Sequence, residues 1–255
     1  MLGARKVAAL VAEFVGTFLL TSVVLGMIAK QQPFYATVLM AGITLALVVL
    51  GVGRASGAHI NPAVTVGLWT IRKVETTRAI AYIAVQLLAG YSALLIAREV
   101  FGNALIARGG ESVDWKIVTA EALGAALFTM GIAAAVYRGY RGVQAAVTIG
   151  ASLTLGLVVA ALGSGAVLNP AVALGINSFT LSYVMGPVLG AVFGMNLYAA
   201  IFAPLDIAER QHALGLLNHA PAAAPHAHAP AKKVAEHATN KPVAKKLSSK
   251  KAIKR

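Results

Sequence analysis

The tripeptide Asn-Pro-Ala occurs twice in the sequence, as Asn61-Pro62-Ala63 and as Asn169-Pro170-Ala171. Asn is among the best N-cap residues and Pro suits the first helical position, so each tripeptide predicts the start of a helix. If the side-chain oxygen of each Asn caps its own helix, its amide NH2 is left free to donate hydrogen bonds into a lumen. The two tripeptides therefore predict a pair of donors for small polar molecules.

Two such donors on facing helices would also discriminate against ions. A water molecule bound between them would offer both lone pairs to the asparagines, which interrupts the hydrogen-bonded chain that a proton needs. Each helix N-terminus carries a partial positive charge, which repels cations. The alternative is two buried turns capped by Asn with no passage between them.

The tripeptides belong to a longer internal repeat. Residues 56–67 align with residues 164–175 without gaps, at a constant offset of 108 (169 − 61). The same offset relates further identical pairs: Ala12 and Ala120, Glu13 and Glu121, Gly16 and Gly124, Thr21 and Thr129, Gly42 and Gly150. Such a repeat indicates two halves with the same architecture.

The composition indicates a membrane protein. The chain of 255 residues is 58% hydrophobic and 12% charged, with a mean hydropathy of +0.75, which is too apolar for an ordinary soluble domain. Six apolar segments have the length of about 20 residues that crosses a bilayer: 7–28, 37–53, 79–97, 117–137, 143–162 and 181–202. The first is longer than the apolar part of a secretory signal and no cleavage site is evident, so we expect a retained span.

Two further apolar stretches, 62–70 and 170–178, are too short to cross a bilayer and must enter and return. Because each half contains three full spans, the second half must cross the membrane in the opposite direction, which makes the repeat inverted. We therefore expect an all-α membrane protein, with six transmembrane helices and two re-entrant half-helices. Residues 1–205 would form a channel domain, with repeats at about 5–100 and 115–203.

The net charge of +13 is concentrated in the C-terminal part of the chain. Residues 206–255 contain ten Lys/Arg and three Asp/Glu in a stretch rich in Ala, Pro and His. This composition predicts a disordered tail, with contact to anionic lipid headgroups as an alternative to a merely solvated segment. Nucleic-acid binding is not expected, because no folded reader or aromatic platform accompanies the charge.

The basic residues near the span ends predict the orientation of the chain. We expect a plasma or inner membrane protein with both termini in the cytoplasm. In this orientation the segments on the inner side contain the larger set of basic residues: Arg5, Lys6, Arg54, Arg72, Lys73, Arg78, Arg138 and Arg141. The segments on the outer side contain a smaller set: Lys30, Arg98, Arg108 and Lys116.

The motifs resemble those of the major intrinsic protein family, the aquaporins and aquaglyceroporins. The matching segments are Ala12–Phe18, Gly57–Thr65, Asn169–Ala171, Gln86 with Gly90, and Gly186-Pro187. The resemblance covers about residues 5–203. It implies a passive channel for water and small uncharged solutes within membrane lipid, assembled as a homotetramer with one pore per subunit.

The resemblance also implies roles for individual residues. Glu13 and Glu121 would accept hydrogen bonds from the two re-entrant loops, a structural role that we favour over proton relay. These bonds would hold a line of carbonyl groups along the pore, those of Gly57, Ala58, His59 and Ile60 and of Gly165, Ala166, Val167 and Leu168. His59 would line the inner vestibule, with pH gating as the less favoured alternative.

The sequence departs from the family at the narrowest part of the pore. Most relatives have Arg directly after the second tripeptide, where this chain has Val172. The other constriction positions, transferred by their spacing from the asparagines, are Ala41, Leu157 and Ala166. Because all four are apolar, we expect a broad and weakly selective pore for neutral solutes. An alternative is a facilitator of glycerol, urea and peroxide with little role in water flux.

Other classes of function are less compatible with the sequence. A secondary transporter also uses inverted repeats, but it needs ionisable groups at the midplane, where this chain has two asparagines. An intramembrane enzyme would need a catalytic constellation inside the spans, and His59 is the only histidine expected there. Cysteine is absent from the sequence, which excludes disulfides and thiolate metal sites. We expect no cofactor, no metal and no catalytic residue.

Overall fold

The computed structural model describes residues 3–102 and 112–213, and the secondary structure within these ranges is helical. Six helices are long and apolar enough to cross a membrane: α1 (Ala4–Ala29), α2 (Phe34–Ser56), α4 (Thr76–Phe101), α5 (Trp115–Tyr137), α6 (Gly142–Ala160) and α8 (Leu181–Ile201). They confirm the six predicted spans. Helices α1, α2, α4 and α5 extend beyond the predicted apolar segments, whereas α6 ends two residues and α8 one residue before the predicted boundary.

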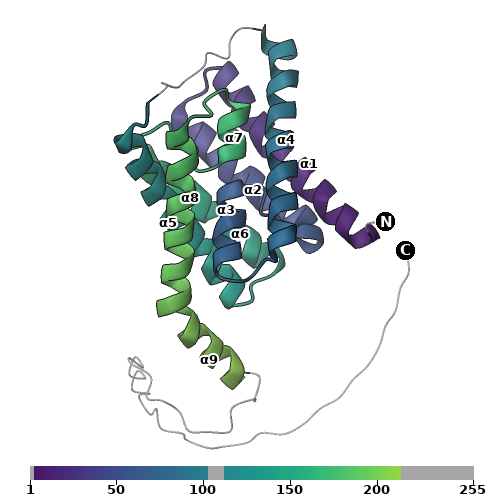
Figure 1. The fold of residues 1–255 in the computed structure, drawn as a ribbon, viewed down its shortest axis with the longest axis vertical. Coiled ribbons are helices and arrows are strands. Elements are labelled where there is room, and N and C mark those ends of the chain that lie inside the picture. Colours follow the sequence, from purple (N-terminus) through teal and green to yellow (C-terminus); the bar gives the residue numbers. More distant parts are fainter. Residues whose placement is uncertain (1–2, 103–111, 214–255) are drawn as a thin grey trace, which may run out of the picture. The chain divides into compact units, whose positions relative to one another are not determined.

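Two short helices lie among the long ones, α3 (Pro62–Thr70) and α7 (Pro170–Gly175) (Figure 1). Helix α3 has the predicted length, but α7 ends three residues before the predicted boundary at 178. Its last turn is closed by a hydrogen bond from the N–H of Ser178 to the carbonyl of Ala173 (2.8 Å), with Asn177 in a left-handed conformation (φ 58°). This Schellman motif ends the helix before Asn177 and Ser178, which the predicted stretch included.

The same capping motif ends α3. The N–H of Lys73 donates to the carbonyl of Leu68 (2.9 Å), and Arg72 is left-handed (φ 58°). Because α7 is three residues shorter than α3, the C-cap residues Ile71 and Ile176 are related by 105 (176 − 71) rather than by 108. The repeat therefore changes register after the half-helices.

Helices α2 and α6 cross at the glycine pair that the repeat relates. A methyl group placed on Gly42 would lie 2.8 Å from the carbonyl oxygen of Gly150 and 2.0 Å from the hydroxyl oxygen of Thr154. A methyl group on Gly150 would lie 2.6 Å from the carbonyl oxygen of Gly42. The two helices can approach this closely only because neither residue has a side chain.

Helix α8 packs against α5 through Gly186, Gly190 and Gly194, which recur every four residues. A methyl group on Gly190 would lie 2.1 Å from the carbonyl oxygen of Ala122, one on Gly194 would lie 2.3 Å from that of Ala126, and one on Gly186 would lie 2.6 Å from the Cβ atom of Glu121. The three glycines therefore allow α8 to pack closely against α5 along this stripe.

A ninth helix, α9 (Ala203–Ala213), follows α8. It covers the first eight residues of the segment that we expected to be disordered, so that expectation is wrong for residues 206–213. Asp206 explains the difference, because it accepts a hydrogen bond from the Tyr198 hydroxyl (2.5 Å) and lies 3.5 Å from the Arg138 guanidinium. These tertiary contacts hold a short polar helix that has little apolar surface of its own. The remainder of the expected tail, 214–255, lies outside the described residues.

Candidate functional site

The two Asn-Pro-Ala tripeptides start the half-helices and meet in the interior of the bundle. The side-chain oxygen of Asn61 accepts a hydrogen bond from the N–H of Ala63 (2.8 Å), and that of Asn169 accepts one from Ala171 (3.0 Å). Each Asn is therefore the N-cap of its helix, with Pro62 or Pro170 at the first helical position. Both asparagines are buried, with 3% and 2% of their surface exposed.

The asparagine amides are not free, in contrast to the prediction. The Asn61 amide donates to the carbonyl of Leu168 (2.8 Å), and the Asn169 amide donates to the carbonyl of Ile60 (3.0 Å). Each amide group has two N–H donors, so one on each side chain is used to bind the opposite loop. The sequence showed the caps, but the close approach of the two halves was needed to show this cross-linking. One N–H of each Asn remains for other partners.

A buried carboxylate holds the first re-entrant loop. The two oxygens of Glu13, which is 0% exposed, accept hydrogen bonds from the N–H groups of His59 (2.9 Å) and Ile60 (2.6 Å). The side-chain amide of Gln86 donates to the same carboxylate (2.8 Å) and also to the hydroxyl of Thr65 (3.0 Å). The buried charge is therefore stabilised by three donors, as an intramembrane carboxylate requires.

The second loop is held in the same way by Glu121. Its carboxylate, also 0% exposed, accepts hydrogen bonds from the N–H groups of Val167 (3.0 Å) and Leu168 (2.7 Å). Its third donor is the Ser164 hydroxyl (2.6 Å), which lies at the start of the loop. The two loops thus have the same backbone contacts but a different third partner, Ser164 here and Gln86 in the first half.

Both loops contain residues in the left-handed region of backbone conformation. Ala58 (φ 50°) and Ile60 (φ 41°) in the first loop correspond at the offset of 108 to Ala166 (φ 53°) and Leu168 (φ 54°) in the second. This conformation is unfavourable for residues with a side chain, especially a β-branched one such as Ile60. The carboxylate contacts fix this strained backbone, which turns successive carbonyl groups away from regular hydrogen bonding.

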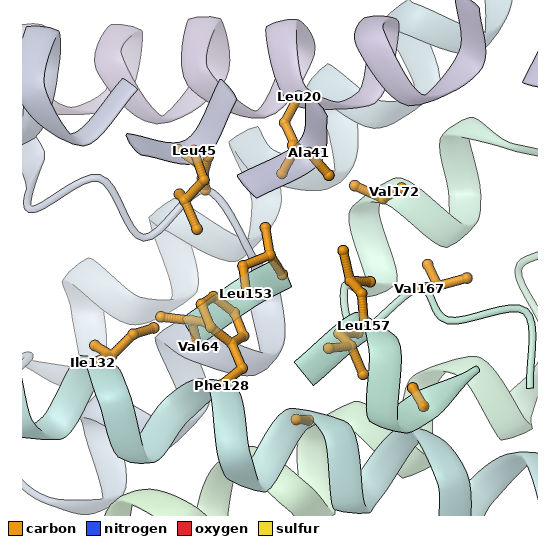
Figure 2. Close-up of a cluster of buried hydrophobic side chains, with 14 of the residues drawn as sticks. Leu20, Ala41, Leu45, Val64, Phe128, Ile132, Leu153, Leu157, Val167 and Val172 are labelled. Atoms are coloured by element: carbon orange, nitrogen blue, oxygen red, sulfur yellow. The ribbon is translucent and has the colours of Figure 1, made fainter. Parts of the chain in front are cut away.

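A cavity of about 360 Å³ extends from residues 31–34, between α1 and α2, to the two asparagines. The four predicted constriction residues, Ala41, Leu157, Ala166 and Val172, all line it. Figure 2 shows Ala41, Leu157 and Val172 converging from different helices. None of the residues that line this cavity is Asp, Glu, Lys or Arg. Solutes inside it would therefore meet polar uncharged groups and apolar side chains.

The predicted line of carbonyl residues is only partly on the cavity wall. His59, Ile60, Gly165, Ala166 and Val167 line the cavity, as do both asparagines. The other predicted members are not part of this wall: Gly57, Ala58 and Leu168. The Pro and Ala residues of both tripeptides also lie behind the wall, where they form the first turns of α3 and α7.

His59 contributes a ring nitrogen near the centre of the site. Its Nδ1 lies 3.2 Å from the Thr65 hydroxyl, and its ring packs edge-on against Tyr82 with 5.1 Å between the ring centroids. The Tyr82 hydroxyl donates to the carbonyl of Ser56 (3.0 Å), at the start of the same loop. His59 is thus fixed by neighbouring side chains as well as by the Glu13 contact to its backbone.

The comparisons with known proteins agree with this geometry. A family model described as Major intrinsic protein matches residues 3–198. The chain belongs to the major intrinsic protein family. It is therefore an integral, multi-pass membrane protein of a channel family, as the sequence motifs indicated.

Several relatives in this family are similar over most of their length. The chain is 32% identical to Aquaporin NIP3-1 of Zea mays, over 74% of this chain and 68% of the relative. It is 28% identical to Aquaporin AqpM of Methanothermobacter marburgensis, over 74% and 94%, and 30% identical to the lens fiber major intrinsic protein of Gallus gallus, over 85% and 90%. The aquaglyceroporin from Plasmodium falciparum has the same fold, with a TM-score of 0.65 at 20% identity over 79% of this chain and 98% of that structure.

The sequence reasoning missed several residues that support this aquaporin fold at its loops. Gln86 and Thr65 were noticed only as part of the family motifs, yet both belong to the hydrogen-bond network around Glu13. Ser56 and Ser164 occupy repeat-related positions, and each hydroxyl accepts a hydrogen bond from the N–H two residues later (2.9 Å and 3.0 Å). Their positions directly before the two loops could have identified these serines in the sequence, because Ser commonly stabilises turns in this way.

Proposed function

We propose that the protein is a passive channel for water and small uncharged solutes such as glycerol, urea and peroxide. The observation that carries this proposal is the pair of Asn61 and Asn169, cross-bonded at the wall of a cavity whose lining has no formally charged side chain. The second N–H of each amide is the donor for a passing oxygen atom. Passage past such neutral groups requires no coupled ion and no chemical step.

Exclusion of protons and cations is part of the same proposal. A water molecule between two amide donors offers its lone pairs to both, so it cannot continue a chain of donors through the centre. A cation that enters between Ala41, Leu157 and Val172 loses its hydration without gaining ligands, which is costly beside apolar side chains. Neutral solutes lose much less.

The apolar constriction supports a second candidate, a facilitator of neutral solutes with little role in water flux. Ala41 and Ala166 are small, and Val172 offers no hydrogen bond where most relatives have Arg, so the constriction would admit molecules larger than water. A constriction with Val172 would also replace fewer of the hydrogen bonds that water loses on entry than one with Arg. The ratio of water to glycerol permeability distinguishes the two candidates.

The remaining features of the assembly are part of the same proposal. The distribution of basic residues supports a cytoplasmic location of both termini, in the plasma or inner membrane. In this orientation, residues 31–34 lie at the outer mouth of the cavity. Membership of the family supports a homotetramer with one pore per subunit, and the lysine clusters of residues 232–254 support contact with anionic lipid headgroups.

Stopped-flow light scattering on proteoliposomes tests the proposed function. Vesicles with the protein should shrink faster than empty vesicles under an osmotic gradient, and should take up glycerol, urea or peroxide with linear concentration dependence. Asn61→Ala should reduce the flux, whereas Asn196→Ala should leave it unchanged, because Asn196 is exposed and bonds only to Thr70 and its own helix. Saturable flux that requires an ion gradient would contradict a passive channel.

A further inference from the structure

Two cations lie beside the outer mouth, although the cavity wall itself has none. Lys30 directly precedes Gln31 and Gln32, which line the cavity. On another segment of the rim, the Arg98 guanidinium donates to the side-chain oxygen of Asn177 (3.4 Å). Asn177 lies between two further residues of the wall, 176 and 178. Both cations are therefore attached to segments that form the rim of the cavity.

The two cations are brought together by the last turn of α4. The Lys30 ammonium lies 5.9 Å from the centre of the Phe101 ring, and Phe101 follows Arg98 by three residues on this helix. Residues three apart share a helix face, so Lys30 and Arg98 approach the same surface of α4. The mouth is thus the place where the end of α1, the end of α4 and the segment after α7 meet.

These charges are not neutralised by carboxylates of the described residues. Within the described residues the structure shows one ion pair, Arg138 with Asp206, which includes neither Lys30 nor Arg98. Glu99 is next to Arg98 in sequence, but successive residues of a helix do not face one another. Arg98 instead binds a neutral amide, and Lys30 a neutral ring.

We propose that Arg98 and Lys30 supply the positive charge that the constriction lacks at Val172, and reject cations at the mouth of the cavity. This inference rests on the proposed function and assigns its cation rejection to named residues. The electric field of charges at the entrance of a cleft with low-dielectric walls is focused into the cleft, and it lowers the concentration of ions of the same sign there. Because these side chains stand outside the narrow part, they add charge without reducing the width of the passage. Rejection of cations and a broad range of neutral solutes are then compatible.

The location at the mouth has a measurable consequence. Arg98 and its surroundings are exposed to solvent, so dissolved salt screens their effect. The screening length is about 30 Å at 0.01 M ionic strength but about 8 Å at 0.15 M. A guanidinium buried in the constriction would be screened much less. The contribution of Arg98 and Lys30 should therefore be large in dilute buffer and small at high salt.

The test compares potassium leak and water flux in the same proteoliposomes, with the full chain. The double variant Arg98→Gln with Lys30→Gln should leak potassium about two to five times faster than the unmodified protein at about 0.01 M ionic strength, with little difference at about 0.15 M. Water flux should be unchanged. Glutamine keeps an amide donor for Asn177, so the variant removes charge without removing the hydrogen bond.

Three further variants complete the test. Arg5→Gln removes an exposed cation from the first turn of α1, at the end opposite Lys30, and should leave the potassium leak unchanged. Arg98→Lys keeps the charge and should also leave it unchanged. If the double variant folds poorly and loses water flux, single Lys30→Gln should still increase the leak in dilute buffer.

The results separate this inference from the proposed function. If the unmodified protein and the double variant both show equally low potassium leak, the proposed role of Arg98 and Lys30 is refuted, but the proposal of a channel for neutral solutes is not. An increase in leak that does not depend on salt would also overturn it, because a structural defect would produce that result. An unmodified protein that already leaks potassium freely would refute ion exclusion itself, and this inference with it.

Discussion

Replacing Glu121 with Gln should loosen the second re-entrant loop. The carboxylate accepts hydrogen bonds from Ser164, Val167 and Leu168 at 2.6, 3.0 and 2.7 Å. A glutamine side chain has the same shape, but one of its two terminal groups is an NH2 donor. Whichever way the amide is turned, at least one buried donor of the loop faces another donor. The substitution therefore leaves a backbone N–H unsatisfied without creating a cavity.

The cost can be estimated from these contacts. An unsatisfied buried N–H costs about 1–3 kcal/mol. For a protein of this size, each kcal/mol corresponds to a shift of roughly 2–4 °C in Tm, so we expect a decrease of about 2–12 °C. Glu121→Ala removes both backbone contacts and should cost about twice as much.

Thermal unfolding in detergent and stopped-flow water flux together test this estimate. Flux should decrease with stability, because the Leu168 carbonyl also accepts the hydrogen bond of the Asn61 amide. Glu75→Gln is the matched control, since Glu75 is exposed and its side chain makes no capping hydrogen bond; its Tm should stay within about 1 °C. If Glu121→Gln behaves like this control in both assays, the loop does not depend on the carboxylate and our account of its strained backbone is wrong.

Two further predictions concern the constriction and the helix crossing. Val172→Arg should reduce glycerol and urea uptake severalfold more than water flux, as measured in proteoliposomes; equal uptake before and after would refute our assignment of the constriction. Gly42→Ala should cost at least about 1–3 kcal/mol in thermal unfolding, because the added methyl group would lie 2.0 Å from the Thr154 hydroxyl oxygen. Gly26→Ala is its control, since nothing lies within 4 Å of the added methyl group, and a loss of stability there would show that the effect is not steric.

The fold could be predicted because each of its determinants is local in the sequence. Six apolar segments of sufficient length require six spans, and an odd number of spans per repeat requires that the halves be inverted. Helix ends that depend on tertiary contacts could not be predicted in this way. Helix α9 is stabilised by Arg138, which lies 68 positions (206 − 138) before Asp206, and by Tyr198 on α8. The end of α7 is set by the left-handed turn at Asn177.

The residues of the site were predictable, but several of their partners were not. The caps of Asn61 and Asn169 follow from a three-residue pattern, and the structure places both in the expected position. The cross-bonds from these amides to the opposite loops join residues 107 and 109 positions apart, so no local pattern contains them. The same applies to Gln86, whose contact with Glu13 bridges 73 positions.

The repeat is preserved where backbone geometry is demanding and lost where only a donor is needed. The left-handed residues other than glycine in the two loops correspond at an offset of 108, and so do the carboxylates that bind these loops. Their third donors, by contrast, are the amide of Gln86 on α4 and the hydroxyl of Ser164 in the loop itself. A strained loop accepts few backbone solutions, whereas a carboxylate oxygen accepts any donor that reaches it. The two halves can therefore diverge in side chains without changing the position of either asparagine, and the wall between them can become apolar while the centre remains a pair of amides.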